Sequence, residues 1–246
     1  MSIPRIYQTS TLKSYTTIRL DEKASHHVAY VLRAKPGDSL VLFNGKGGEY
    51  TGVINRIDKK YVEVEIKQFI AHEVESEVAI SLAQGIARGD KMDVIVQKSV
   101  ELGVQTIMPL ITERCHFSKS SAQQKRLAHW QAVAISACEQ CGRNRLPSIT
   151  APIMFNEWIE LAKADHCFVL SPYHAADMNF KNLPEIKSII LLVGSEGGLT
   201  DDEVHLAIHH QFSPLYLGPR ILRTETASLA AISIIQAYLG DMKIFL

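Results

Sequence analysis

Two arginines and a glutamate stand close together in residues 217–227 (LGPRILRTETA) of the 246-residue chain. Arg220 and Arg223 follow a Gly-Pro pair, and Glu225 comes just before a long apolar helical pattern. Cationic donors can stabilise negative charge that develops on a substrate oxygen, and a carboxylate beside them can accept a proton or orient an arginine. The alternative is structural, with Glu225 as an acid favoured in the first turn of a helix and the arginines solvated or paired with it.

A glycine-rich loop, GSEGG at residues 194–198, directly follows the apolar run at 188–193. In open α/β sheets, ligands bind at the carboxyl ends of strands, so this turn is a binding-site candidate. It is neither GxGxxG nor a Walker loop, and the next helix opens with three acids behind a Thr200 cap, which with Glu203 forms a capping box. These acids complement the helix dipole and would repel a pyrophosphate. The pattern favours a nucleoside with little or no negative charge, and a plain strand-to-helix turn is the alternative.

The elements that must position these loops follow from hydrophobic periodicity. Alternating and β-branched residues predict strands at 39–43, 50–57 and 61–69, separated by turn residues, and therefore a small antiparallel sheet or barrel. The polar stretch 71–77 reads as a linker.

Beyond the linker, strands alternate with helices. Strands are predicted at 78–84, 105–111, 166–171, 188–193 and 214–217, and helices at 90–102, 123–141, 156–164, 200–211 and 225–239. Such alternation is typical of an α/β domain with a mainly parallel sheet. Because the carboxyl ends of parallel strands meet at one edge, the 194–198 and 217–227 loops are expected to face the same crevice.

The net charge is zero, with 26 Lys and Arg against 26 Asp and Glu, but the charges are unevenly spread. Residues 1–72 carry 11 basic and 7 acidic residues, which leaves 15 basic and 19 acidic residues for the remainder. The excess of basic residues in 1–72 is a hint of contact with a polyanion, and random scatter of surface charge explains it equally well.

Several other classes of protein are disfavoured. No apolar run approaches the roughly 20 residues that span a bilayer, and the N-terminus lacks a signal-peptide core, so a cytoplasmic protein without membrane contact is expected. Cys138 and Cys141 form a C-x-x-C pair inside a predicted helix, and no second pair stands at zinc-finger spacing. We therefore expect no metal site and no redox role.

Five motifs together resemble one family, the small-subunit ribosomal RNA methyltransferases that methylate a uridine at ring nitrogen 3, which belong to the SPOUT superfamily. They are IPRIY with HVAYVLRAKPGD near the N-terminus, QKSVELGVQTIMPLITERC at 97–115, EQCGRNRLP at 139–147, GSEGG at 194–198 and LGPRILRTETA at 217–227. They occur in the family's order and span nearly the whole chain. Ser195 is a departure, because the family more often has proline there.

The resemblance implies two domains: a PUA-like, RNA-binding β barrel at 1–72 and a SPOUT α/β domain with a trefoil knot at 73–246. It also implies a homodimer whose active sites are completed by the partner chain. The apolar face of the last helix would either contribute to the dimer contact or be buried within its own subunit; it comprises Leu229, Ile232, Ile235 and Leu239.

The implied cofactor is S-adenosylmethionine, held by three loops. The corresponding residues are Leu170, Ser171 and Pro172, then Gly194, Ser195, Glu196, Gly197 and Gly198, and finally Leu217, Gly218, Ile221 and Leu222.

The implied reaction is methylation of N3 of a uridine in 16S ribosomal RNA, at the family site uridine 1498, in the assembled small ribosomal subunit. Arg223 is the first candidate to stabilise the uracil anion and Arg220 the second, while Glu225 would accept the proton or orient an arginine. The candidate RNA-binding residues are Arg5, Tyr7, His27, Arg33, Lys35, Arg88 and Arg143.

Two other functions fit the same residues. One is an RNA-binding ribosome assembly protein with a vestigial cofactor site, which the intact glycine loop and both arginines argue against. The other is a SPOUT methyltransferase that acts on transfer RNA; only the N-terminal barrel and the EQCGR segment argue for ribosomal RNA instead.

Overall fold

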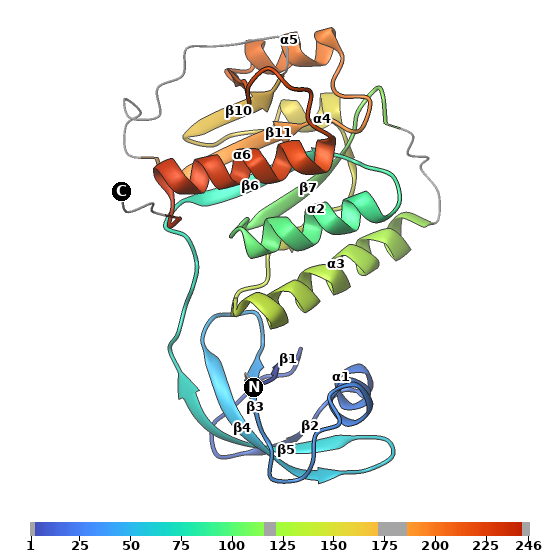
Figure 1. The fold of residues 1–246 in the computed structure, drawn as a ribbon, viewed down its shortest axis with the longest axis vertical. Coiled ribbons are helices and arrows are strands. Elements are labelled where there is room, and N and C mark those ends of the chain that lie inside the picture. Colours follow the sequence, from blue (N-terminus) through green and yellow to red (C-terminus); the bar gives the residue numbers. More distant parts are fainter. Residues whose placement is uncertain (1–2, 116–121, 172–185, 243–246) are drawn as a thin grey trace. The chain divides into compact units, whose positions relative to one another are not determined.

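The computed structural model describes residues 3–115, 122–171 and 186–242. The chain divides into two compact units (Figure 1). Unit 1 comprises Met1–Glu75 and Ile135–Leu146, so it includes a segment from the second half of the sequence. Unit 2 comprises Ser76–Ala134 and Pro147–Leu246.

Unit 2 is built on a parallel sheet with the order β12-β10-β11-β6-β7-β8, and β9 also pairs with β7. Every strand pair in it is parallel, which confirms the predicted α/β architecture. The strands are β6 (Ala79–Gly85), β7 (Thr106–Ile111), β8 (Ser148–Ile149), β9 (Ile153–Met154), β10 (His166–Leu170), β11 (Ser188–Val193) and β12 (Ser213–Leu215). The apolar run at 188–193 forms β11, whose last five residues are buried, as expected for a strand covered on both faces.

Helices cover both faces of this sheet. Figure 1 shows α2 (Asp90–Glu101) and α6 (Thr224–Leu239) side by side in front of it. On the other face, α4 (Phe155–Ile159) and α5 (Asp201–His209) pack with β10 and β11 in one buried cluster, which includes Trp158, Val169, Leu192 and Ala207. Helix α4 ends at Ile159, five residues before the predicted end, and Leu161 just beyond it is 72% exposed.

The apolar face of α6 is used largely inside its own subunit. Ile232 and Ile235 are fully buried, whereas Leu229 and Leu239 are half-buried. Helix α6 contacts α2 and β11, which supply this cover. Of the two alternatives for this face, burial within the subunit therefore holds for Ile232 and Ile235.

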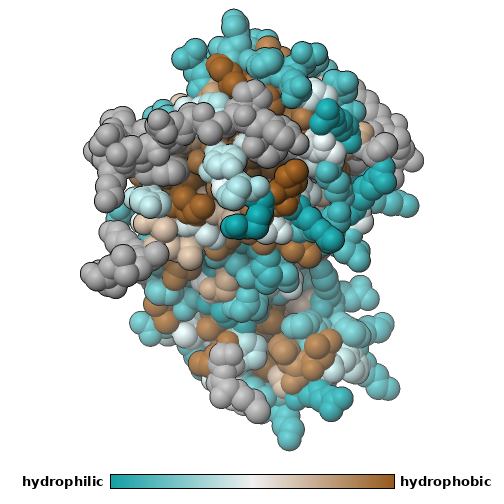
Figure 2. Space-filling model, turned by 45° about the horizontal axis from the view of Figure 1, so that its top comes forward, coloured by the Kyte–Doolittle hydropathy of each residue, from teal (hydrophilic) through white to brown (hydrophobic). Residues whose placement is uncertain are grey.

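The visible surface in Figure 2 is mostly hydrophilic, with hydrophobic residues in small groups. Among the described residues, no helix has the length and apolar character needed to cross a membrane. Within the same ranges, no group of three or more His, Cys, Asp or Glu residues is arranged to hold a metal ion. Cys138 and Cys141 both lie in α3 (Ala122–Cys141) as free thiols, and burial raises the pKa of Cys138 to about 12.

Unit 1 contains a five-stranded sheet with the order β1-β3-β4-β5-β2. Strands β3 (Ser39–Phe43), β4 (Glu49–Ile57) and β5 (Val62–Ile70) confirm the three predicted strands to within one residue at each end. Strands β1 (Arg5–Tyr7) and β2 (Thr17–Arg19) were not predicted, because three residues are too few to show an alternation. β1 runs parallel to β3, and the other neighbours are antiparallel.

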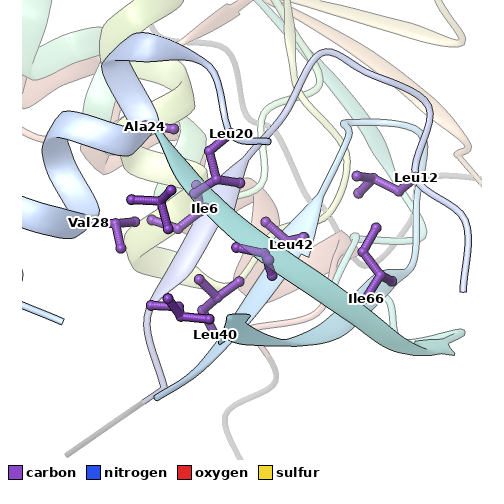
Figure 3. Packing of buried hydrophobic residues seen from close by; sticks show 11 residues of the cluster. Ile6, Leu12, Leu20, Ala24, Val28, Leu40, Leu42 and Ile66 are labelled. Atoms are coloured by element: carbon purple, nitrogen blue, oxygen red, sulfur yellow. The ribbon is translucent and has the colours of Figure 1, made fainter. Parts of the chain in front are cut away.

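One hydrophobic cluster holds unit 1 together (Figure 3). Along β5, Val62, Val64 and Ile66 are fully buried while the glutamates between them are partly exposed, as the alternating sequence predicts. Ala24 and Val28 close the cluster from a short helical segment, formed by α1 (Glu22–His26) and a π-helical turn η1 (His27–Val31).

Candidate active site

A cavity of about 410 Å³ opens in unit 2 at the carboxyl ends of β10, β11 and β12. Its volume falls within the range of small-molecule sites, roughly 300–1,000 Å³. Every described residue of the expected cofactor set lines it, namely Leu170, Ser171, Gly194, Ser195, Glu196, Gly197, Gly198, Leu217, Gly218, Ile221 and Leu222. Pro172 lies outside the described residues. The three loops, which are far apart in the sequence, therefore line one cavity.

Glycines allow the backbones of the 194–198 loop and β6 to pack directly against each other. A Cβ on Gly85 would lie 2.5 Å from the Ser195 nitrogen, and a Cβ on Gly194 would lie 2.5 Å from the carbonyl carbon of Gly198. The Gly198 N–H donates to the Ser195 carbonyl at 2.9 Å, and Gly198 has a φ of +73°. The loop is a tight turn in which these positions require glycine.

Arg114 also lines the cavity; it lies in the 97–115 motif but was not among the expected site residues. Its Nη1 donates to the carbonyl oxygens of Gly197 and Leu199 at 3.0 and 3.1 Å. The Ser195 hydroxyl donates in turn to the Arg114 carbonyl at 3.3 Å. The signal for Arg114 was its place just after the predicted strand at 105–111, at the same edge of the sheet as the glycine loop.

Carboxylates line the side of the cavity nearest α5. Thr200 and Glu203 form the predicted capping box, in which the Glu203 N–H donates to Thr200 Oγ1 at 3.2 Å and the Thr200 N–H to Glu203 Oε2 at 2.9 Å. Asp201 and Glu196 border the cavity. This arrangement disfavours a phosphate and suits a neutral or cationic ligand.

Glu196 is held in its ionised form. Burial opposes ionisation, but hydrogen bonds from the backbone N–H of Arg88 and from Lys91 outweigh it, so the Glu196 pKa lies below its ordinary value. The Arg88 N–H donates to Glu196 Oε1 at 2.9 Å, and Lys91 Nζ lies 3.3 Å from the same oxygen. A negative charge at the cavity wall is therefore permanent at neutral pH.

The three candidate catalytic residues cluster where β12 leads into α6. Arg220 is exposed and lines the cavity. Arg223, also exposed, is the residue that precedes α6, and Glu225 stands in its first turn. Arg223 and Glu225 are not among the lining residues, but Thr224 between them is.

The charges of this cluster are not neutralised locally. Within the described ranges, neither arginine forms an ion pair, so the pairing with Glu225 weighed from the sequence is not present. Glu225 Oε2 is buried and has no hydrogen-bond partner among the described residues. Both arginines are thus accessible to a substrate or a partner chain.

Two of the expected RNA contacts are instead engaged inside unit 1. Arg5 Nη1 pairs with Glu49 Oε2 at 2.5 Å, and Arg5 Nη2 donates to Asn144 Oδ1 at 2.6 Å. Arg143 is only 3% exposed and holds Glu75 through two bonds, from Nε at 2.9 Å and from Nη2 at 2.6 Å. Since parting a buried pair leaves an uncompensated charge, their placement favours a structural role over a phosphate contact.

The other candidates differ in how accessible they are. Tyr7 is half-buried against Phe43, with ring centroids 5.6 Å apart, and burial raises its pKa. His27 is half-buried in η1, and in the same turn Tyr30 is 58% exposed with its ring 5.0 Å from that of His26. The exposed cations of the expected set are Arg33, Lys35 and Arg88.

Family models match both parts of the chain. An RNA methyltransferase domain matches residues 74–236, and an RNA methyltransferase PUA domain matches residues 20–67. These matches agree with the resemblance seen in the motifs.

Individual relatives cover nearly the whole chain. The ribosomal RNA small subunit methyltransferase E of Buchnera aphidicola subsp. Schizaphis graminum is 40% identical, with 98% of each chain covered. A Legionella pneumophila protein solved with the bound cofactor SAM is 40% identical, with a TM-score of 0.93 over 98% of this chain and 100% of that one. The Neisseria gonorrhoeae ribosomal RNA small subunit methyltransferase E, solved bound to S-adenosyl methionine, is 38% identical with a TM-score of 0.90 over the same shares. The chain therefore belongs to the RNA methyltransferase family that includes the ribosomal RNA small subunit methyltransferases E.

Proposed function

We propose that the protein transfers a methyl group from S-adenosylmethionine to N3 of a uridine in the RNA of the small ribosomal subunit. The observation that carries the proposal is the cavity at the carboxyl ends of β10, β11 and β12, which every described residue of the three expected cofactor loops lines. The SAM-bound relatives support the choice of ligand.

The residues of the cavity fit this cofactor. Glycine-rich backbone that lies close to the cavity can bind a nucleoside through main-chain groups, and the ionised Glu196 suits a positively charged ligand better than a phosphate. When bound, S-adenosylmethionine would supply the methyl group from its sulfonium. The loops at 170–171, 194–198 and 217–222 would hold it.

The cluster at the start of α6 would activate the uridine. The ring nitrogen of uracil is a poor nucleophile until its proton leaves, and the resulting negative charge spreads onto the flanking carbonyl oxygens. Arg223, with Arg220 as the second donor, would stabilise that charge, and a comparable oxyanion donor contributes about 2.7–4 kcal/mol. Glu225, whose Oε2 has no hydrogen-bond partner among the described residues, would accept the proton or orient an arginine.

The two domains would divide the work. Residues 1–72, which include the match to the PUA model, would form the PUA-like RNA-binding barrel, and residues 73–246 the knotted SPOUT domain. Arg33, Lys35 and Arg88 are the exposed cations best placed to contact phosphates. The target uridine must be turned out of any base pair, since its reactive edge is hidden there.

A homodimer and a trefoil knot complete the proposal. Ile221 at the cavity is 76% exposed and Tyr238 on α6 is 59% exposed, so an apolar partner surface would cover both. The knot is the fold that the family resemblance implies, and the strand order, in which β12 lies beside β10, is compatible with it. We place the enzyme in the cytoplasm, with its ribosomal substrate.

Labelled methyl transfer tests the function. Purified protein and methyl-labelled S-adenosylmethionine are incubated either with small ribosomal subunits from a strain that lacks this gene or with transfer RNA from the same strain. We expect label in the 16S RNA alone. Label in transfer RNA would establish the SPOUT alternative. A failure to bind the cofactor in a calorimetric titration would indicate a non-catalytic RNA-binding protein.

A further inference from the structure

Two glutamines in unit 2 are fully buried, and one of them, Gln84, hydrogen-bonds to residues that line the cavity. Gln84 and Gln236 each have no exposed surface. Gln84 stands next to last in β6, in a strand whose neighbouring residues Leu82 and Ala83 are apolar. A buried amide is costly unless its hydrogen bonds are made, so an amide here needs a specific reason.

The hydrogen bonds of Gln84 join three segments. Its Nε2 lies 2.9 Å from the Gly85 carbonyl, 3.1 Å from the Gly194 carbonyl and 3.0 Å from Thr224 Oγ1. Because carbonyl oxygens only accept, the nitrogen must face them, and this fixes the amide orientation. Oε1 then accepts a 2.6 Å bond from the Ser228 hydroxyl of α6.

Thr224 belongs to the same hydrogen-bond network. Its hydroxyl donates to the Gly194 carbonyl at 2.6 Å, so both Gln84 and Thr224 hold the first residue of the glycine loop. Ser228 Oγ also lies 2.9 Å from the Thr224 carbonyl, which ties the network to the first turn of α6. All four side-chain and backbone partners are buried.

We propose that Gln84 is a positioning residue that fixes the cofactor loop at Gly194 relative to the start of α6, where Arg223 and Glu225 flank Thr224. Gln84 is not among the residues that line the cavity, so it acts through Gly194 and Thr224, which are. The inference rests on the proposed function for its effect on methyl transfer. The coupling of the two segments by Gln84 is a property of the free protein and does not depend on any substrate.

Gln236 provides a matched control in the same unit. Its Nε2 donates to the Leu102 carbonyl at 2.8 Å, and its Oε1 accepts from the Ser76 hydroxyl at 2.9 Å. It is the same residue type with the same burial, and it lies on α6, but its hydrogen bonds join it to Ser76, Leu102 and Asp241, which do not line the cavity. Gln84→Met and Gln236→Met therefore remove comparable buried amides.

The experiment combines hydrogen exchange of the free protein with cofactor affinity and turnover. In Gln84→Met, amide exchange should accelerate in residues 194–199 and 224–228, and kcat should fall by about 10- to 100-fold with a smaller change in KM for RNA, as misplacement by about 1 Å does. Gln236→Met should lower Tm by a similar amount and leave exchange in both segments and kcat near wild type. Thr224→Val, which removes the hydroxyl that donates to the Gly194 carbonyl, should also lower kcat.

Equal exchange and equal kcat in the two methionine variants would overturn the inference. If Gln84→Met does not fold, Ser228→Ala, which removes only the bond to Oε1 and its tie to Thr224, gives the same comparison. If hydrogen exchange differs between the two methionine variants as expected but the wild-type protein transfers no methyl group, the proposed function is contradicted. The positioning of the two segments by Gln84 is not.

Discussion

Arg143 in unit 1 is 3% exposed and holds Glu75 through two bonds, whereas Arg220 and Arg223 in unit 2 are exposed and form no ion pair within the described residues. All three are arginines in motifs that the sequence marked as functional. The difference is in what surrounds them. A guanidinium that is already satisfied inside a unit stabilises that unit, and one left without a carboxylate beside a cavity is available for chemistry.

The largest effect is expected at the satisfied arginine. Arg143→Ala should lower the free energy of unfolding by about 3–5 kcal/mol, because the Glu75 carboxylate, on a side chain that is only 13% exposed, is left without its partner. Arg56→Ala, which breaks the exposed pair with Asp58, should cost less than about 1 kcal/mol. Urea unfolding of both variants checks this, and a small decrease for Arg143→Ala would return this residue to the candidates for RNA binding.

Arg223→Ala should have the opposite effect, with a large loss of turnover and little loss of stability. We expect turnover to fall by about 10²- to 10³-fold with cofactor and RNA saturating, since an oxyanion donor is removed. Stability should be nearly unchanged, because the side chain is exposed. Single-turnover methyl transfer measures the first effect and thermal unfolding the second. Normal turnover in this variant would remove Arg223 from the catalytic residues.

Features that depend on neighbouring residues could be predicted from the sequence, whereas contacts between distant residues could not. The β11 strand and the Thr200–Glu203 capping box follow from local patterns, so both were predicted correctly. The ion pair of Arg143 with Glu75 joins residues 68 positions apart, and no local pattern encodes it. Arg114 was missed for the same reason, since its hydrogen bonds to the glycine loop are made only in the folded sheet.

The exposed cations of unit 1 should contribute a smaller, salt-dependent effect. Arg33→Ala with Lys35→Ala should weaken RNA binding similarly for all sequences. The slope of log affinity against log salt should become shallower by about one for each phosphate that the variant no longer neutralises. Titrations of RNA at low and physiological ionic strength measure the slope. An unchanged slope in the double variant would place the RNA on another surface.

The smallest effect concerns Glu196 and pH. Its pKa is lowered in the folded protein, so its contribution to stability is present above the ordinary value of 4.5 and disappears as pH falls through the folded pKa. The stability difference between wild type and Glu196→Gln should therefore be largest at neutral pH and shrink below pH 4.5. Urea unfolding over this range checks it, and a difference that grows on acidification would contradict the assignment.

We propose that this cavity and the arginines beside it methylate N3 of a uridine. This activity is tested most directly by mass mapping of 16S RNA after purified protein and S-adenosylmethionine have acted on unmethylated small ribosomal subunits. We expect 3-methyluridine at a single position with wild-type protein and almost none with Arg223→Ala. A methyl group on a different base or on a ribose, or no methyl group from a protein that binds the cofactor, would contradict it.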